Sequence, residues 1–347
     1  MKITTENIIL NFIVYITAFL LAIGLGAVLI WAILRIHPFS ALSLIVSSAL
    51  LTSFGRTATF YYLVELTLIS LGLAISYRAK YWNIGGDGQL IFGAIFSMQA
   101  IFSIGHLFSP WLAIVATLLM GMLGGALYGV IPAIIKAKLN VNEVLSTLML
   151  NFIAIYFMTW LVDITGPWKD PQAAELESYP IPYSLYLENP VILTLIMVFA
   201  IAIIYILAEK TSLGFKIKVI GSSHSAAEYA GIDRGKVYIY IGLISGALAG
   251  LAGSIEILSV SHILSSSFDS LYMGYLGIFT TWLASLNPLF VILSSLLMST
   301  LLSGGYFMEA IAGVSVLFIY YFEGIMFISI IIFEATKSKI KKVLKFG

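Results

Sequence analysis

Residues 191–208 of the chain are VILTLIMVFAIAIIYILA, eighteen positions without a charged residue or a proline. A bilayer is crossed by an α-helix of about 20 predominantly apolar residues. Inside a membrane every backbone polar group has to be satisfied within the protein, so spanning segments are helices or closed barrels. The stretch is too long and too uniformly apolar for a barrel strand. It therefore predicts a transmembrane helix.

The composition extends this prediction to the rest of the chain. Of the 347 residues, 60% are hydrophobic and only 10% are charged, whereas soluble domains contain roughly 25% charged residues. The 18 Lys and Arg against 17 Asp and Glu give a net charge of +1, so no basic surface indicates binding to nucleic acid. Because the chain has no cysteine, disulfides, thiolate metal sites and cysteine nucleophiles are excluded.

Further apolar segments predict an all-α polytopic membrane protein with about ten transmembrane helices. We expect these helices to form one transmembrane domain over residues 1–347. Short apolar stretches at 40–54 and between 271 and 302 indicate one or two re-entrant segments. The ten expected spans are 8–34, 58–77, 86–104, 111–135, 143–162, 191–208, 238–260, 271–286, 289–302 and 314–333.

Charged residues indicate the side of the membrane on which each loop lies. The loop 209–237 and the tail 335–347 are rich in Lys and Arg, whereas the loop 163–190 holds five acids and one lysine. Cytoplasmic loops carry an excess of Lys and Arg. We therefore expect a protein of the cell membrane with both termini and the loop 209–237 in the cytoplasm, and with the acidic loop outside.

Two sets of glycines recur every four residues, which places each set on one face of a helix. Small residues at this spacing let helix backbones approach closely in lipid. The sequence therefore predicts two packing faces, which are also compatible with sliding between transport states. The sets are Gly121, Gly125 and Gly129, and Gly242, Gly246 and Gly250.

A polar break opens the expected span 86–104. Residues 81–89 are YWNIGGDGQ, in which Asn83, Asp87 and Gln89 accompany three glycines. Polar side chains beside irregular backbone at membrane depth indicate a functional site. The segment also fits a polar helix start at the cytoplasmic surface, because Arg78 and Lys80 lie just before it. Both interpretations stay open at this point.

The loop 209–237 is longer than a connector between two spans requires. Ser225 and Glu228 have the spacing of a capping box, and Gly231 is a helix-ending residue. We therefore expect a short exposed helix over 226–230, with Ser225 as its cap. Such a helix suggests a docking surface, and a plain solvated loop is the alternative.

Acidic residues also lie in or near the expected spans. They are Glu65, Glu143, Glu256, Asp269, Glu309 and Glu323. Acids in lipid face a bundle interior or a cavity. They could relay protons in an ion-coupled carrier, although pairing, hydrogen bonding or a buried neutral carboxyl explains most of them equally well.

The sequence contains no motif for catalysis or for a metal. The four histidines lack metal-ligand spacing, and neither a P-loop nor a G-x-S-x-G or H-E-x-x-H motif occurs. We therefore expect no enzyme activity, no bound metal and no cofactor on this chain.

Four stretches resemble one family. NIGGDGQ (83–89) is similar to the NIGAEGQ segment of permeases of ATP-binding-cassette (ABC) importers of the branched-chain amino acid and ribose type. VNEVLSTLMLN (141–151) resembles a run of the subgroup that imports nucleosides with basic-membrane-type lipoproteins. AAEYAGI (226–232) and GALAGLAG (246–253) agree with the same family. The resemblance covers roughly residues 60–305 and departs at Gly86, at Asp87, after Ser259 and at MGYLG (273–277).

The resemblance implies a permease subunit that forms a pathway for a nucleoside or simple sugar. ATP would be hydrolysed by a separate ATPase subunit, beside a second permease and an extracytoplasmic lipoprotein that delivers the solute. The expected pathway residues are Asn83, Asp87, Gln89, Asn142 and Asn151. The expected coupling residues, which would contact the ATPase, are Ser225, Ala226, Ala227, Glu228, Tyr229, Ala230 and Gly231.

Two other classes of protein remain as alternatives. An ion-coupled secondary transporter would bind a proton at Glu323 or Glu256 and would need no partner ATPase. A non-transporting membrane scaffold would leave the polar break at 83–89 without a role. The exposed helix at 226–230 discriminates between the classes, because a secondary carrier does not require it.

Overall fold

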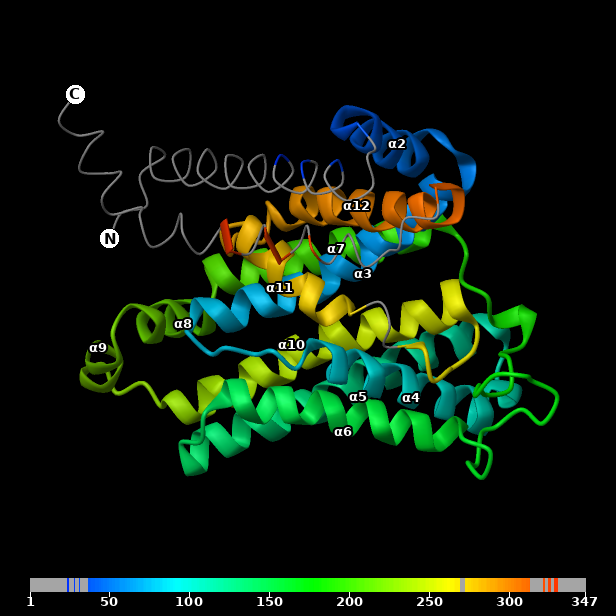
Figure 1. Ribbon diagram of the computed structural model, residues 1–347. Helices are drawn as coiled ribbons and strands as arrows, with labels where there is room; N and C mark the ends of the chain where they lie inside the picture. Colours follow the sequence, from blue (N-terminus) through cyan, green and yellow to red (C-terminus); the bar gives the residue numbers. More distant parts are fainter. Residues whose placement is uncertain are drawn as a thin grey trace. The chain divides into compact units, whose positions relative to one another are not determined.

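The computed structural model describes residues 37–268 and 272–312, together with the single helical residues 24, 28, 31, 321, 324, 325, 328 and 329. This part of the chain contains eleven α-helices, α2 to α12, and three short helical turns (Figure 1). It divides into two compact units. We call Val64–Ile278 the central unit, and Met1–Leu63 with Phe279–Gly347 the terminal unit.

Most elements follow one another with short connections, and longer ones come after α6 and after η3. Their bounds are α2 Pro38–Leu51, α3 Ser53–Arg78, α4 Gly86–Ile104, η1 Gly105–Leu107, α5 Pro110–Leu139, α6 Glu143–Val162, η2 Tyr183–Leu185, α7 Pro190–Lys210, α8 Ser212–Ser222, α9 His224–Tyr229, α10 Arg234–Glu256, η3 Ile257–Ser261, α11 Met273–Leu283 and α12 Val291–Ala312.

Local sequence sets where the long helices begin. Asn142, Asn189 and Asp233 are N-caps whose side-chain oxygens accept backbone N–H groups of the first turns of α6, α7 and α10. Pro110 and Pro190 occupy the first position of α5 and α7, where the missing N–H costs no hydrogen bond. These caps and prolines fix the residues at which the helices begin after the connecting loops.

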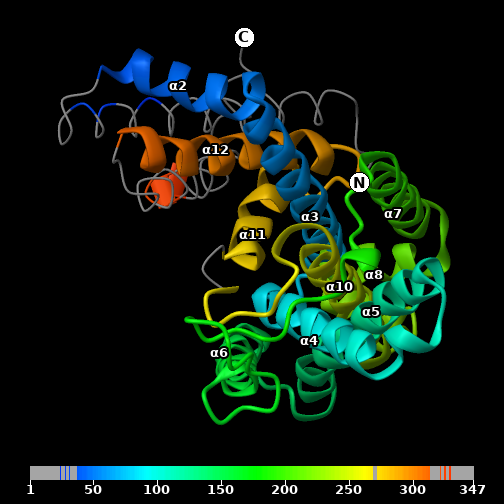
Figure 2. The ribbon, with the colours of Figure 1, turned by 90° about the vertical axis from the view of Figure 1, so that its right-hand side faces the viewer.

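The core of the central unit is formed by α4, α5 and α10. Helix α10 packs against both α5 and α4, and α4 also packs against α6 (Figure 2). The apolar span that contains α10 is 83% buried, whereas the corresponding parts of α6 and α7 are only 28% buried. Large apolar side chains stay exposed on α6 and α7, among them Tyr156, Trp160 and Phe199. Such a surface fits lipid rather than water.

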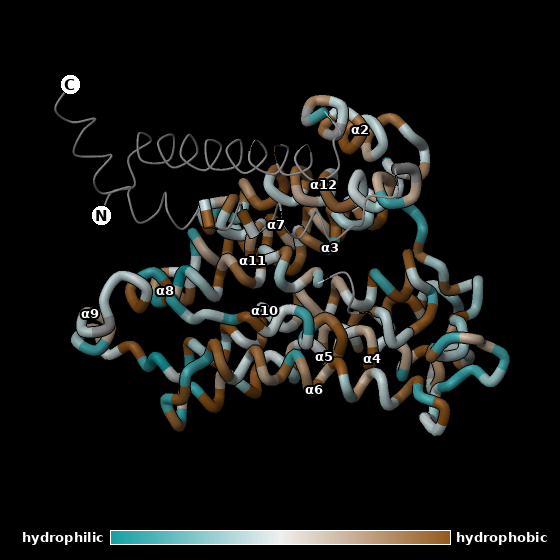
Figure 3. Tube along the Cα trace, in the orientation of Figure 1, coloured by the Kyte–Doolittle hydropathy of each residue, from teal (hydrophilic) through white to brown (hydrophobic). Residues whose placement is uncertain are grey.

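Six helices of the described residues are long and apolar enough to cross a membrane. They are α3, α5, α6, α7, α12, and α10 together with η3, and they match six of the ten expected spans. The expected span 86–104 forms α4, which is not among the six. Hydrophilic positions gather at the ends of the central unit and apolar ones along its helices (Figure 3).

The other predicted spans are not shown as such. The segment 271–286 forms the 11-residue helix α11, which rises only about 16 Å at 1.5 Å per residue and is too short to span. The stretch 40–54 covers most of the 14-residue helix α2, Pro38–Leu51, and no re-entrant path is shown for it. Most residues of the predicted spans 8–34 and 314–333 lie outside the described part of the chain.

The terminal unit is held by packing of α2 against α12. The Ser303 hydroxyl of α12 donates to the Gly55 carbonyl over 3.2 Å, and the backbone of Ile45 lies so close to Gly304 that a Cβ there would overlap it. A glycine in α12 thus permits the close approach of the two helices.

The capping prediction for the loop 209–237 was wrong in one respect. Helix α9 starts two residues earlier than expected, and its N-cap is Ser223, whose hydroxyl accepts the Ala226 N–H at 3.3 Å. Ser225 lies inside the helix instead. Either serine could accept the backbone N–H of the residue three positions later, so spacing alone does not identify the N-cap. Gly231 follows the helix with a left-handed φ of 65°, as a helix-ending glycine does.

Candidate functional site

The chain is irregular between α3 and α4, at residues 79–85. It turns at Lys80, which has a left-handed φ of 55°, and the buried Tyr77 hydroxyl donates to the Asn83 carbonyl over 2.9 Å. An irregular backbone within a membrane bundle needs such partners, because water is not present to satisfy it. This break is where polar side chains gather in the central unit.

Asn83 lies at the centre of the break and has no exposed surface. Its Nδ2 donates to Gln89 Oε1 at 3.2 Å and to Ser245 Oγ at 3.1 Å, while its Oδ1 accepts the Gly85 N–H at 2.9 Å. Since Gln89 belongs to α4 and Ser245 to α10, Asn83 ties the break to two core helices.

Helix α6 supplies the second set of partners. Asn151 Nδ2 donates to the Ile84 carbonyl and its Oδ1 accepts the Gly88 N–H, both at 2.9 Å. One helical turn earlier, the Thr147 hydroxyl accepts the Ile84 N–H at 3.1 Å. The backbone of the break is therefore hydrogen-bonded by amide and hydroxyl side chains of a neighbouring helix.

Asp87 connects the first turn of α4 to the first turn of α11. Its Oδ1 accepts the Gly274 N–H at 2.6 Å. The backbones approach closely here, since a Cβ on Gly86 would lie 2.9 Å from the Gly274 Cα. Glycine at both positions therefore permits the contact that Asp87 makes.

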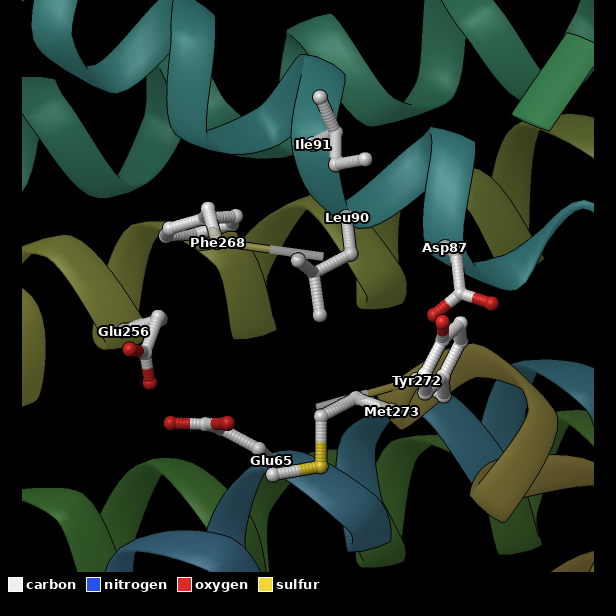
Figure 4. A pocket seen from close by; sticks show the side chains of 8 residues that line it. All are labelled: Glu65, Asp87, Leu90, Ile91, Glu256, Phe268, Tyr272 and Met273. Atoms are coloured by element: carbon white, nitrogen blue, oxygen red, sulfur yellow. The ribbon is translucent and has the colours of Figure 1, made fainter. Parts of the chain in front are cut away.

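Asp87 also lines a small cavity within the central unit, which we call the carboxyl cavity (Figure 4). Glu65 of α3 and Glu256 of α10 point toward one another across it. It has room for little more than one water molecule. Its three acids do not form a metal-ligand set in the part of the chain that is described. The remaining lining is Leu90, Ile91, Phe268, Tyr272 and Met273.

The structure does not bring every predicted residue to this region. Asn142 is exposed, and its side chain caps α6 by accepting the Val144 N–H at 2.9 Å. Glu143 does reach the break, because it pairs with Lys136 Nζ at 2.9 Å and also accepts the Trp82 N–H at 3.5 Å. Glu309 is exposed on α12. Asp269 and Glu323 lie outside the described residues.

The two glycine sets face each other between α5 and α10. A Cβ on Gly129 would lie 2.5 Å from the Gly242 carbonyl oxygen, and one on Gly125 would lie 2.6 Å from the Gly250 Cα. Neither helix has space for a side chain at these positions. The glycines thus allow the two central helices to touch backbone to backbone.

Helix α9 is an exposed element at one end of the central unit (Figure 1). Tyr229 is 94% exposed, while Ala227 is buried. The preceding helix α8 is bound to the end of α3, because Glu209 accepts hydrogen bonds from both Arg78 and Lys218. This arrangement joins the segment that carries α9 to the residue directly before the break.

The acidic loop pairs with the segment that follows η3. The Ile181 N–H donates to the His262 carbonyl at 2.9 Å, and the His262 ring stacks on Tyr186 with a centroid distance of 3.6 Å. Burial lowers the pKa of His262, and the nearby Glu188 carboxylate opposes this effect only partly. The loop is therefore fixed to the end of the central unit opposite α9.

Sequence reasoning missed several partners of the break. Thr147 and Ser245 gave no separate signal, although Glu143, Thr147 and Asn151 recur every four residues in an otherwise apolar helix and could have been found by that spacing. The contact between Glu65 of α3 and Glu256 of α10 could not have been found, because the two residues are 191 positions apart in the sequence.

These features define a multi-pass membrane protein whose bundle encloses a polar break. The family model of the branched-chain amino acid transport system permease component matches residues 55–333. The chain belongs to this family, and the resemblance to permeases of ABC importers is confirmed. Members of the family are transport subunits and not enzymes.

Relatives with curated names are similar over most of the chain. A nucleoside ABC transporter permease of Lactococcus lactis is 30% identical, covering 86% of this chain and 84% of its own. A glucose ABC transporter permease of Haloferax volcanii is 29% identical over 85% and 80%. A guanosine ABC transporter permease of Bacillus subtilis is 28% identical over 71% and 72%.

Proposed function

We propose that this permease forms part of the translocation pathway for a nucleoside or a simple sugar in an ABC importer. The observation that carries the proposal is the break at residues 79–85, where Asn83, Gln89 and Asn151 place amide groups inside an apolar bundle. Nucleosides and sugars are neutral and rich in hydroxyls, which amide and carboxyl groups bind well. The names of the relatives point to the same two classes of solute.

The partners follow from the same assignment. A separate ATPase would bind α9, whose Tyr229 projects from the central unit, and would supply the P-loop that this sequence lacks. A second permease would complete the pathway, and an extracytoplasmic lipoprotein would deliver the solute at the acidic loop. In this orientation both termini lie in the cytoplasm.

The geometry suggests how ATP hydrolysis would reach the pathway. Movement of α9 would pass through α8 and Glu209 to Arg78, directly before the break. The break is held by hydrogen bonds from α4, α6 and α10, so a shift of α3 would exchange these bonds between two arrangements. Transport needs such a difference in contacts between two states.

Affinity purification from the native membrane in mild detergent tests the proposal. Mass spectrometry should find a P-loop ATPase with the wild-type chain. The ATPase should be lost when residues 226–231 are replaced by a Gly/Ser linker of equal length. A co-purifying second permease or lipoprotein would support the remaining partners. Recovery of this chain alone, still transporting guanosine, uridine or glucose in vesicles without ATP, would contradict the proposal.

A further inference from the structure

The carboxyl cavity contains two acids that the network around Asn83 does not use. Glu65 is 0% and Glu256 is 6% exposed. Three of their oxygens are buried and accept no hydrogen bond from an N–H or hydroxyl group of the described residues. They are both carboxyl oxygens of Glu65 and Oε2 of Glu256. The group that faces each of them is another acid (Figure 4).

This arrangement is unfavourable for the fold taken alone. A proton on one of the two acids lets that carboxyl group donate to the other, but the remaining buried oxygens still lose their hydration without gaining a donor. Apolar side chains of similar size would fill the same space at lower cost. Two facing acids therefore indicate a site that receives hydrogen-bond donors from something other than the chain.

The surrounding backbone also departs from regular helix at this place. Helix α10 continues directly after Glu256 into the π-helical turn η3, and π-helical turns occur frequently at functional sites. On the other side, Asp87 stands at the start of α4, beside the break. The cavity is thus bordered by two irregular segments that can rearrange.

The geometry points to Glu65 and Glu256, together with Asp87, as a recognition site for the hydrogen-bond donors of an uncharged solute in transit. This inference rests on the proposed function and adds to it the residues that read the solute. Carboxyl oxygens accept hydroxyl and N–H groups, while Phe268 and Tyr272 offer ring faces for a sugar or a base. Among the described residues that line the cavity there is no Lys or Arg, so the acids would disfavour phosphate and carboxylate groups.

The cavity in this conformation is smaller than a sugar, so the site has to widen during the transport cycle. The irregular segments at Asp87 and after Glu256 are the places where we expect this widening. A solute released from the delivery protein would then meet the two acids after it has entered the bundle. Their loss should lower the maximal rate of uptake rather than the apparent affinity for the loaded delivery protein.

The test uses the complete importer in proteoliposomes, with guanosine, uridine and glucose as probes. Uptake of each probe is compared with uptake of analogues that each lack one hydroxyl group. The measurements are made for wild type, Glu65→Gln, Glu256→Gln and the control Glu309→Gln, an exposed acid of α12. A pH-sensitive dye inside the vesicles reports proton movement.

We expect Glu65→Gln and Glu256→Gln to lower the maximal rate by up to about tenfold, as loss of one hydrogen bond to a buried group does. For each acid, removing one particular hydroxyl group of the solute should slow uptake by wild type by a similar factor. The same removal should slow the variant without that acid little further, because the effects of two groups in contact are not additive. Glu309→Gln should transport normally. Unchanged rates in both cavity variants would overturn the inference.

Two further results would also overturn it. If the loss of uptake caused by each missing hydroxyl multiplied with the loss caused by each substitution, the acids would not contact the solute. If the vesicle interior acidified with uptake, and this stopped in Glu65→Gln, the pair would carry protons instead. In both cases ATP-driven uptake would leave the proposed function standing. The absence of ATP-driven uptake of all three probes by wild type would contradict the proposed function as well.

Discussion

At the scale of single residues, Asn83 is the position of the break at which we expect a substitution to have the largest effect. Replacing Asn83 with Ala leaves the Gly85 N–H without its side-chain acceptor and deprives Gln89 and Ser245 of a partner. Each buried polar group left unsatisfied costs about 1–3 kcal/mol. We expect at least a tenfold loss of uptake in membranes that contain normal amounts of the subunit.

Asn142→Ala is the matched control for this prediction. It removes an exposed N-cap of α6, which costs about 1 kcal/mol of stability but no contact of the break. Equal losses of uptake in the two variants would show that Asn83 acts only through folding.

His262 provides a pH dependence at the end of the central unit opposite α9. Because its pKa in the folded protein is lowered, the unfolded chain binds more protons once the pH falls below about 6.5. Stability should therefore be complete above that pH and decrease below it. The unfolding temperature of the purified subunit should fall between about pH 7.5 and pH 5.5, and less so in His262→Gln. Parallel curves for the two proteins would contradict this account.

At the scale of helices, the contact between α5 and α10 depends on glycine. In Gly125→Ala the new methyl group would lie 2.6 Å from the Gly250 Cα, so the two backbones would have to separate. We expect a lower unfolding temperature and poor assembly. Gly105→Ala is the control, because its nearest neighbours lie 3.6 Å away or further. Similar behaviour of both variants in thermal unfolding would argue against the packing role.

Helix α9 yields the second prediction at this scale. Glu228→Lys reverses a charge on the exposed helix without touching its cap, Ser223. We expect the complex to hydrolyse ATP without importing solute, while the subunit keeps its unfolding temperature. Phosphate release and uptake, measured on the same vesicles, check this. Normal ratios of uptake to hydrolysis would remove α9 from the mechanism.

The sequence was most informative where a local signal decides the structure. Gly231 follows the end of α9 as predicted, and the apolar run 191–208 forms α7 almost to the residue. The sequence was less informative where two nearby residues can play the same part or where hydrophobicity does not fix the length of a helix. Ser223 and Ser225 are equivalent as caps by spacing, and the segment 271–286 is apolar enough for a span but curls into a shorter helix.

At the scale of the molecule, prediction of the site was limited by contacts between distant helices. The polar residues of 83–89 could be recognised as unusual, and Asn151 through the family run. Which groups satisfy them depends on how α4, α6 and α10 pack, and this appears only in the fold. The pairing of Glu65 with Glu256 is of the same kind, since each acid alone looks like an ordinary buried carboxyl.

The central claim is that this permease moves solute only when ATP hydrolysis on another subunit acts through α9. ATP-driven uptake of guanosine, uridine and glucose by the reconstituted complex tests it most directly. Wild type should accumulate at least one of them with ATP and none without it. The variant with residues 226–231 replaced by a Gly/Ser linker should accumulate none. Accumulation driven by a proton gradient without ATP, in wild type and linker variant alike, would contradict the account.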